Sequence, residues 1–260
     1  MNTPPPASSA IETRELAIGY NGKAIMSDIA LAIRPGEIFF IMGGSGSGKS
    51  TLLKTLIGLI PPVSGRIFYR ESEFTEEDPE TAARILRNTG VLYQGGALFS
   101  SMTLLENVAL PLRIHTQLPE TDILELAEYK LNLVELGPAV AKYPHEISGG
   151  MMKRAGLARA LALDPEILFF DEPSAGLDPL TSRQLDETIL ELNRSLGTTT
   201  LIVSHELESI FTLAHRAVFL NAATRRQMEV GDPKIMREQS EHMEIRNFLN
   251  RRKPGEDSTS

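Results

Sequence analysis

The chain has 260 residues, and 42% of them are hydrophobic, which is enough to bury the core of one large domain or two small ones. A formal net charge of −8 and a pI near 5.3 exclude a generally basic surface, so we expect no nucleic-acid partner. The sequence contains no cysteine, which excludes disulfides and thiolate metal sites and is typical of a reducing compartment. We therefore expect a cytoplasmic protein.

The first ten residues, MNTPPPASSA, are mostly Pro, Ser and Ala and can bury little surface, so we predict that residues 1–10 are disordered. They lack the basic and apolar regions of a signal peptide. No run in the chain approaches the 18 apolar residues of a membrane span. If the protein works at a membrane, we expect another chain to span it.

Residues 11–33 have the alternating pattern of strands, interrupted by the turn-forming pair Asn21-Gly22. This pattern predicts a small antiparallel sheet. Tyr20 ends the first of the two predicted strands. An aromatic ring in this place can pack in the core or at its rim, or it can stack on the face of a base such as adenine.

A phosphate-binding loop is predicted directly after the apolar run Ile38–Met42, which is typical of a strand buried on both faces. Its glycines let the backbone turn tightly and point N–H groups at a di- or triphosphate, and the leucines that follow repeat at helical spacing. Lys49 adds a positive charge, and Ser50 can offer its hydroxyl to Mg²⁺. The loop has the Walker A pattern, Gly43-x4-Gly48-Lys49-Ser50. The predicted nucleotide-binding residues are Gly43, Gly44, Ser45, Gly46, Ser47, Gly48, Lys49, Ser50 and Thr51.

A second buried strand is predicted at residues 89–93 and ends at Gln94. An amide at the carboxyl end of such a strand can face bound Mg²⁺ or water, or it can be an ordinary loop amide. Residues 100–137 then have helical spacing, with a capping box from Thr103 to Glu106 and a stop at Gly137. We therefore predict a helical subdomain, at about residues 97–165, inserted into an α/β core.

The segment Ser148-Gly149-Gly150-Met151 precedes a predicted helix over residues 152–163. Ser148 is a good N-cap, and the two glycines would let a phosphate approach bare backbone N–H groups. A plain capped helix explains the same pattern, so the segment alone does not decide between the two interpretations.

Two carboxylates, Asp171 and Glu172, follow the apolar run Ile167–Phe170, which predicts a buried strand. Ligands of open α/β sheets lie at the carboxyl ends of the strands, although two acids in this place can also form a solvated loop. Because the chain also has a phosphate loop, we expect Asp171 to hold Mg²⁺ through water and Glu172 to polarise an attacking water.

A tight loop over residues 174–178 leads to another predicted helix, with Thr181 and Gln184 as a possible capping box and Gly197 as its end. Residues 198–203 then predict a buried strand.

His205 follows this strand, on the sheet edge where the phosphate is expected. The other four histidines have no motif around them, and we interpret them as surface or packing residues. Residues 216–220 predict a last strand, and residues 232–260 predict a helical extension with a polar tail.

The order and spacing of these motifs resemble the ATP-binding subunits of ABC transporters, from about residue 11 to about residue 231. The resemblance implies an α/β fold with a P-loop NTPase core, a mainly parallel sheet, an N-terminal antiparallel β subdomain and an inserted helical subdomain. It also implies ATP and Mg²⁺ as cofactors. Tyr20 would then stack on adenine, and residues 147–151 would be the family signature. The catalytic residues would be Lys49, Gln94, Glu172 and His205, and the Mg²⁺ residues Ser50, Gln94 and Asp171.

The resemblance implies a mechanism that needs two copies of the chain, facing each other head to tail. Each ATP would lie between the Walker A loop of one copy and Ser148, Gly149 and Gly150 of the other. Closing and opening of this dimer would drive separate membrane permease subunits, through the groove between the Gln94 loop and the helical subdomain. The chain would therefore lie at the cytoplasmic face of the inner membrane, held there by the permease.

One position departs from the usual signature, which ends in Gln, whereas residue 151 is Met and offers no amide. The serine and both glycines are present, so we expect γ-phosphate capture to persist. Residues 90–116 and 147–182 look like the ATPase subunit of Mla-type phospholipid transporters. This resemblance implies phospholipid transport between the membranes of a Gram-negative cell envelope. It also implies an MCE-domain lipid-binding protein and a small STAS-type subunit as partners.

Other functions stay open beside a lipid transporter. The chain could serve an importer for another substrate, or it could be a soluble ABC ATPase that acts on ribosomes or DNA. Soluble ABC proteins usually carry two cassettes or a long coiled-coil insertion, and this chain has neither. It could also bind ATP as a structural switch without turnover, against which Glu172 and His205 argue.

Overall fold

The computed structural model describes residues 9–251. The predicted disorder of residues 1–10 falls mainly on residues 1–8, and the predicted polar tail falls mainly on residues 252–260, so both lie almost wholly outside the described residues. Ala10 is buried, and its N–H donates to the carbonyl of Ile33. Ala10 therefore belongs to the folded domain.

The described strands form one sheet. They are β1 (Ile11–Tyr20), β2 (Lys23–Ile33), β3 (Ile38–Met42), β4 (Ser64–Tyr69), β5 (Ser72–Glu73), β6 (Thr89–Leu92), β7 (Ile167–Asp171), β8 (Thr199–Val203), β9 (Arg216–Asn221) and β10 (Arg226–Gly231). Their order across the sheet is β5-β4-β1-β2-β10-β9-β3-β8-β7-β6. The strands β1, β2, β4 and β5 pair antiparallel, whereas β9, β3, β8, β7 and β6 pair in parallel. The predicted antiparallel subdomain and mainly parallel core are thus confirmed.

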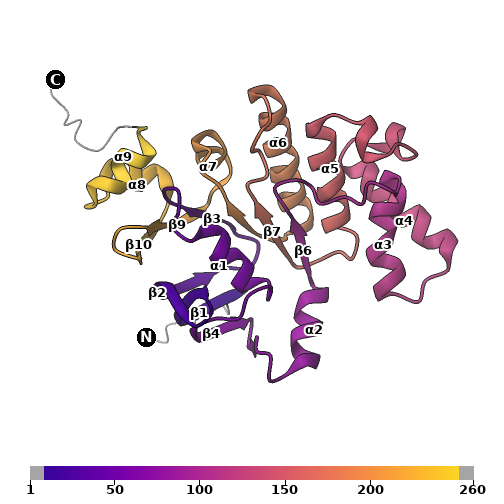
Figure 1. Cartoon of the computed structure of the whole chain (residues 1–260). Helices are drawn as coiled ribbons and strands as arrows, with labels where there is room; N and C mark the ends of the chain where they lie inside the picture. The colour runs from indigo at the N-terminus through magenta and orange to yellow at the C-terminus, as the bar shows by residue number, and fades with distance from the viewer. Residues whose placement is uncertain (1–8, 252–260) are drawn as a thin grey trace, which may run out of the picture.

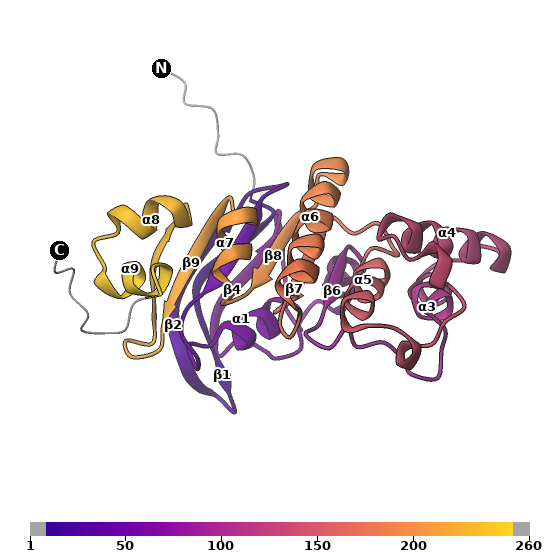
Figure 2. The same ribbon diagram turned by 90° about the horizontal axis from the view of Figure 1, so that it is seen from above.

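The helices lie on both faces of this sheet and at its two ends. They are α1 (Lys49–Leu56), α2 (Pro79–Arg87), α3 (Leu104–His115), α4 (Glu120–Leu133), α5 (Gly149–Ala160), α6 (Pro179–Leu196), α7 (Leu207–Leu213), α8 (Pro233–Gln239) and α9 (Met243–Leu249). The helices α3, α4 and α5 gather beyond the edge strand β6, and α8 and α9 lie at the opposite end of the molecule (Figures 1 and 2). Among the described residues, no helix has the length and hydropathy needed to cross a bilayer.

The central strand β3 is buried on both faces, as its apolar run predicts. Phe39 and Ile41 pack into a core formed with α1 and the antiparallel strands. Phe40 and Met42 point the opposite way, into a core shared with the helices that follow β6 and β7. Since burial of each such side chain stabilises the fold by roughly 1.5–3 kcal/mol, β3 firmly fixes the start of the glycine loop.

Several predicted caps are confirmed. Thr103 accepts a hydrogen bond from the N–H of Glu106, and the carboxylate of Glu106 accepts one from the N–H of Thr103, so the capping box opens α3. Gly197 ends α6 in the left-handed conformation, with a φ of 66°. Ser148 caps α5, which begins at Gly149 rather than at residue 152.

The predicted cap of α6 is wrong. The carboxylate of Asp178 accepts hydrogen bonds from the N–H groups of Leu180 and Thr181, and Pro179 occupies the first position of the helix. A carboxylate at this position also interacts favourably with the helix dipole. It therefore replaces the capping box that Thr181 and Gln184 would have formed.

The predicted stop at Gly137 is also wrong, because α4 ends at Leu133 and Gly137 begins a short 3-10 turn. The sequence patterns did not predict β5, α2, α7 or β10. The division into an ATPase domain at 11–231, a helical subdomain at about 97–165 and an extension at 232–260 stays a proposal.

Candidate functional site

Three glycines of the loop between β3 and α1 have positive φ, namely Gly43, Gly46 and Gly48. Gly43 has a φ of 148°, and a Cβ there would lie 2.3 Å from the carbonyl oxygen of Leu220. Gly48 has a φ of 87° and is the N-cap of α1, which begins at Lys49. The loop therefore brings bare N–H groups and the positive end of a helix dipole to the carboxyl edge of the sheet.

Lys49 folds back over this loop. Its Nζ donates to the carbonyl oxygen of Gly43 at 2.9 Å and to that of Gly44 at 3.0 Å. Burial lowers the pKa of Lys49, while the nearby carboxylates of Glu172 and Asp171 act in the opposite direction. A phosphate could replace the two neutral carbonyls as acceptor and would form stronger, charge-assisted bonds.

Two side-chain oxygens that can bind a hard metal ion lie close together: the hydroxyl of Ser50 in α1 and the carboxylate of Asp171 in β7. The Oγ of Ser50 lies 3.3 Å from Oδ1 of Asp171 and donates to it. Mg²⁺ prefers such ligands and usually completes its octahedron with phosphate oxygens and waters. Within residues 9–251 there is no cluster of three His, Cys, Asp or Glu side chains that could hold a metal by itself. The pair therefore fits a Mg²⁺ that arrives with a nucleotide.

Glu172 has the most unusual environment of the predicted site residues. Its Oε1 lies 2.9 Å from Nδ1 of His205, and its Oε2 is buried without a hydrogen-bond partner among the described residues. Its backbone has a φ of 50°, a region that glutamate adopts rarely and that is common at functional sites. The N–H of Glu172 donates to the carbonyl of Val203 at 2.9 Å, which helps to hold this conformation. The role of Glu172 as a proton acceptor stays a prediction.

The phosphate loop, Glu172 and His205 border one cavity of about 680 Å³, a size that suits a small-molecule ligand. Its lining residues are Gly43, Gly44, Ser45, Gly46, Lys49, Ser50, Gln94, Glu172, His205, Leu207, Phe248 and Arg251. The structure thus brings Gln94, Glu172 and His205 to the phosphate loop from three separate parts of the chain.

Tyr20 lies beside the phosphate helix. Its hydroxyl is 3.3 Å from Oγ1 of Thr51, and 47% of the residue is exposed. An exposed ring next to a phosphate site is free to stack on a base. The adenine-stacking role of Tyr20 stays a prediction.

The signature residues do not line the cavity of their own chain. The Oγ of Ser148 accepts a hydrogen bond from the N–H of Met151 at 3.3 Å, and Ser148 and Gly149 are exposed. Gly150 is buried, and a Cβ there would lie 2.3 Å from Cγ2 of Thr181. Close packing is thus one reason for this glycine. The role of Ser148 to Met151 at an ATP stays a prediction.

Four residues at the site, one of them Leu207 at the start of α7, were not singled out in the sequence. Phe248 and Arg251 line the cavity from the C-terminal extension, and the ring of Phe248 packs edge-on against Phe219 at 5.4 Å. Lys153, in α5, donates to the backbone carbonyls of Gln94 and Glu172. The sequence shows a lysine shortly after the signature, but this pattern does not indicate which groups accept hydrogen bonds from it.

A phosphate loop, a hydroxyl–carboxylate pair and a carboxylate–histidine pair at the carboxyl edge of a mainly parallel sheet define a P-loop nucleotide hydrolase. Residues 26–175 match the family model described as ABC transporter. The chain therefore belongs to the ABC transporter family, in which it is an ATP-hydrolysing cassette.

Two groups of relatives carry different names. The chain is 40% identical over 250 residues to the probable ribonucleotide transport ATP-binding protein mkl of Mycobacterium leprae, covering 96% of this chain and 71% of that protein. It is 38% identical over 213 residues to the intermembrane phospholipid transport system ATP-binding protein MlaF of Escherichia coli K12, covering 82% of this chain and 79% of that protein.

Solved structures of ABC cassettes have the same fold. CbiO1 from Clostridium perfringens, part of the ABC transporter complex cbiONQ, is similar with a TM-score of 0.81 and 26% identity, over 95% of this chain and 96% of that chain. The dimeric structure of MJ0796, a bacterial ABC transporter cassette, is similar with a TM-score of 0.77 and 27% identity, over 85% and 98% of the two chains. The predicted ABC ATPase fold is thus confirmed.

Proposed function

We propose that two copies of the chain bind ATP head to tail, each ATP lying between the phosphate loop of one copy and the start of α5 in the other. The exposed Ser148 and Gly149 support this arrangement, because a capped helix N-terminus attracts an anion and this one does not face the cavity of its own chain. The dimeric form of the similar cassette MJ0796 supports it as well.

The observation that carries the proposed hydrolysis is the buried Oε2 of Glu172, which has no hydrogen-bond partner in the described part of the chain. Oε2 takes a proton from a water molecule as the water oxygen attacks the γ-phosphorus and the bond to the β-phosphate oxygen breaks. His205 contacts Oε1 of Glu172 and so orients Oε2. The side chain of His205 is 57% exposed, and its ring can reach the γ-phosphate. Lys49 stabilises the charge on the phosphate oxygens.

Mg²⁺, when bound, would neutralise charge that develops on the phosphate oxygens. Ser50 and Asp171 would hold it, and Gln94 lines the cavity from a third segment and could contact it through its amide. Asp171 ends a buried strand, so its carboxylate needs little reorganisation to bind the ion.

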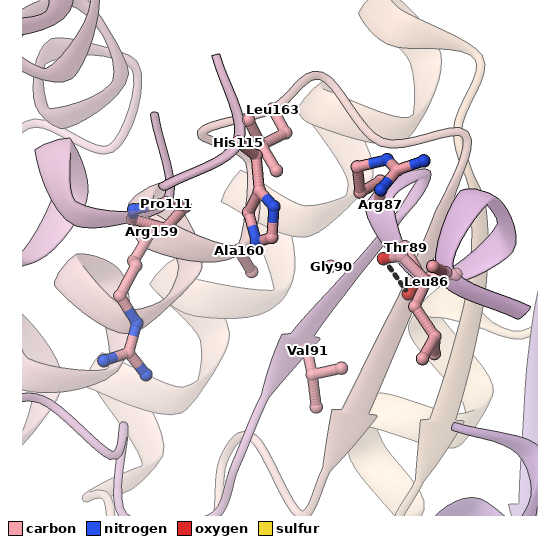
Figure 3. Close-up of a pocket in the computed structure, with 11 residues that line it drawn as sticks. Leu86, Arg87, Thr89, Gly90, Val91, Pro111, His115, Arg159, Ala160 and Leu163 are labelled. Atoms are coloured by element: carbon pink, nitrogen blue, oxygen red, sulfur yellow. Dashed lines mark hydrogen bonds between the residues drawn. The ribbon is translucent and has the colours of Figure 1, made fainter. Parts of the chain in front are cut away.

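A groove beside the edge strand β6 is our proposed docking place for a membrane permease. It is a cavity of about 390 Å³, with Pro111 and His115 of α3 on one side of β6 and Leu86 and Arg87 of α2 on the other (Figure 3). Arg159 of α5 also lines it. Apolar walls that carry cations fit a short permease helix with an apolar face and a carboxylate.

This groove contacts the ATP site through the Gln94 loop. Arg159 donates to the carbonyl oxygen of Gly96 at 3.1 Å and to that of Ala97 at 2.7 Å. A permease helix that presses on Arg159 would therefore move the loop that carries Gln94. ATP-driven closure and permease movement are coupled in this way.

We further propose that the transported substrate is phospholipid, moved between the membranes of a Gram-negative cell envelope. The Escherichia coli relative that is named for intermembrane phospholipid transport supports this substrate. The partners would be permease subunits, an MCE-domain lipid-binding protein and a small STAS-type subunit. The chain would then lie at the cytoplasmic face of the inner membrane, attached through the permease.

A second candidate is an ABC transporter for ribonucleotides, because the Mycobacterium leprae relative is named for that substrate and is 40% identical. The two candidates share the ATP site and differ in the cargo, which this chain would not touch. They are therefore separated only by the proteins and small molecules that accompany the chain.

The test is purification of the tagged full-length chain from detergent-solubilised membranes, followed by identification of copurifying proteins and extracted lipids. We expect a permease, an MCE-domain protein and bound phospholipid. A permease without lipid, whose complex takes up ribonucleotides in vesicles, would establish the second candidate. Recovery with ribosomes, or without any membrane protein, would overturn both.

A further inference from the structure

Lys153 is a buried lysine that contacts the backbone of the site from behind the cavity lining. It lies in α5, five residues after Ser148, and only 6% of it is exposed. A buried ammonium is costly unless its N–H groups find acceptors. Its Nζ donates to the carbonyl oxygen of Gln94 and, at 3.3 Å, to that of Glu172. One side chain thus joins the backbones of two site residues from distant parts of the sequence.

The rest of α5 packs tightly on the same loop. A Cβ on Gly156 would lie 2.7 Å from Cδ1 of Leu92 and 3.1 Å from the Cα of Gly96, so a larger residue there would force its neighbours to shift. Arg159, one turn further, donates to the carbonyl oxygens of Gly96 and Ala97. The helix that begins with the signature therefore follows the Gln94 loop from Lys153 to Arg159.

The contact with Glu172 acts on a strained residue. The N–H of Glu172 donates to Val203 on one side, and its carbonyl accepts from Lys153 on the other, so both peptide groups around the φ of 50° are held. Burial lowers the pKa of Lys153, and the carboxylates of Glu172 and Asp171 oppose that effect. These carboxylates partly compensate the cost of burying the ammonium.

We propose that Lys153 is a positioning residue, whose ammonium holds the Gln94 loop and the Glu172 backbone together so that both side chains face the ATP cavity. The inference rests on the proposed function, because the start of α5 would bind the ATP of a second copy while Lys153 acts on the ATP site of its own chain. Lys153 then connects the two ATP sites of a dimer through one rigid helix.

The test compares Lys153→Met, which keeps most of the volume and removes the donors, with the wild-type full-length chain. Steady-state ATP hydrolysis gives kcat and KM, and titration with a fluorescent ATP analogue gives the affinity of the site. We expect kcat to fall about 10- to 100-fold, because misplaced catalytic groups cost this much, while the affinity changes less than about 3-fold. Lys153→Arg should recover most of kcat, since a guanidinium can reach both carbonyls.

A matched control is Lys130→Met, because Lys130 is also a buried lysine, only 3% exposed, but bonds to Asp164 in the helical region. The Lys130→Met variant shows how the loss of a buried ammonium outside the site changes Tm and kcat. We expect a lower Tm in both variants and a lower kcat only in Lys153→Met. If Lys153→Met does not fold, Lys153→Gln serves instead, because its amide is uncharged and its stem is one atom shorter.

Two results would overturn the proposal. One is a wild-type kcat in Lys153→Met or Lys153→Gln; the other is a kcat that falls equally in the Lys130 and Lys153 variants, which would make the effect purely structural. The failure of the proposed function is a different result, because the wild-type chain itself would then hydrolyse no ATP.

Discussion

The proposed role of Glu172 as general base can be tested by a substitution that changes one side-chain oxygen to an amide nitrogen. Replacing Glu172 by Gln keeps the shape and the contact with His205 but removes the proposed proton acceptor at Oε2, which is buried without a partner within residues 9–251. We expect Glu172→Gln to bind ATP like the wild type and to lose turnover by a factor on the order of 10² to 10⁴, the range for loss of a general base. Hydrolysis under single-turnover conditions and analogue binding measure the two quantities.

The exposed Glu208, three residues after His205, supplies the matched control, since Glu208→Gln changes a carboxylate of α7 outside the cavity. Its kcat should equal that of the wild type. If Glu172→Gln hydrolyses ATP at the wild-type rate, Glu172 is not the base, whatever its geometry.

Most site residues could be predicted because each stands in a local pattern. Gly43 to Ser50 follow an apolar run, Asp171 ends β7, and His205 follows the end of β8, where the carboxyl ends of these parallel strands meet at one edge. Lys153 could not be predicted, because its acceptors Gln94 and Glu172 are 59 and 19 residues away and the contacts depend on how α5 packs. Arg251 could not be predicted, because its place in the cavity depends on how the C-terminal extension packs. Such contacts leave no periodic signal in the sequence.

Asp186 connects two helices next to the site. It lies in α6, is 4% exposed and accepts a hydrogen bond from Ser209 of α7 at 2.7 Å, while its Oδ1 has no partner among the described residues. Burial raises the pKa of Asp186 to about 6 from 3.8, and the Ser209 hydroxyl opposes the rise. The folded state thus holds the proton more tightly than the unfolded state, so the charged carboxylate opposes folding.

This effect predicts a pH-dependent difference in stability. The unfavourable contribution of the charged Asp186 carboxylate to folding is fully present above pH 6 and fades as the pH falls from about 6 to about 4. It is at most roughly 3 kcal/mol for a pKa change of this size. The Tm of Asp186→Asn minus that of the wild type should therefore rise as the pH increases from 4 to 8. The control Glu191→Gln, on the exposed side of α6, should show a constant difference; a flat profile for Asp186→Asn would contradict the pKa.

The proposed permease groove beside β6 predicts different effects for two arginines of α2. Arg87 and Arg84 are both exposed on this helix, but only Arg87 lines the groove, whereas Arg84 donates to Ser72. Arg87→Glu should weaken recovery of the membrane subunits by about 10-fold or more, because like charges across an interface cost over 1.4 kcal/mol. Arg84→Glu should leave recovery unchanged. Equal recovery with both variants would place the permease elsewhere.

Element boundaries show where local patterns suffice and where they fail. The capping box at Thr103 and the glycine stop at Gly197 are determined by residues within one turn, and both are confirmed. The cap of α6 was mispredicted although Asp178 is followed by Pro179, and a proline at the first helical position is a local signal for a cap at the residue before it. The capping-box pattern of Thr181 and Gln184 was the weaker of the two local signals.

In the proposed arrangement, the whole molecule presents two different halves of an ATP site. Lys49 and Glu172 line a cavity at the carboxyl edge of the sheet, and the exposed Ser148 begins a helix that does not line it. A single chain therefore has both parts but does not bring them together. A second copy that binds head to tail would complete both sites at once.

Mixing two inactive variants tests this arrangement directly. Lys49→Ala should abolish phosphate binding, and Ser148→Arg should block the α5 N-terminus at a cost in cap stability of about 1 kcal/mol. In a mixed dimer, the intact phosphate loop of the Ser148→Arg chain meets the intact signature of the Lys49→Ala chain. About a quarter of wild-type activity should return, since half of randomly formed dimers are mixed and each has one intact site of two. If the ATP site were complete within one chain, the mixture would stay as inactive as its components.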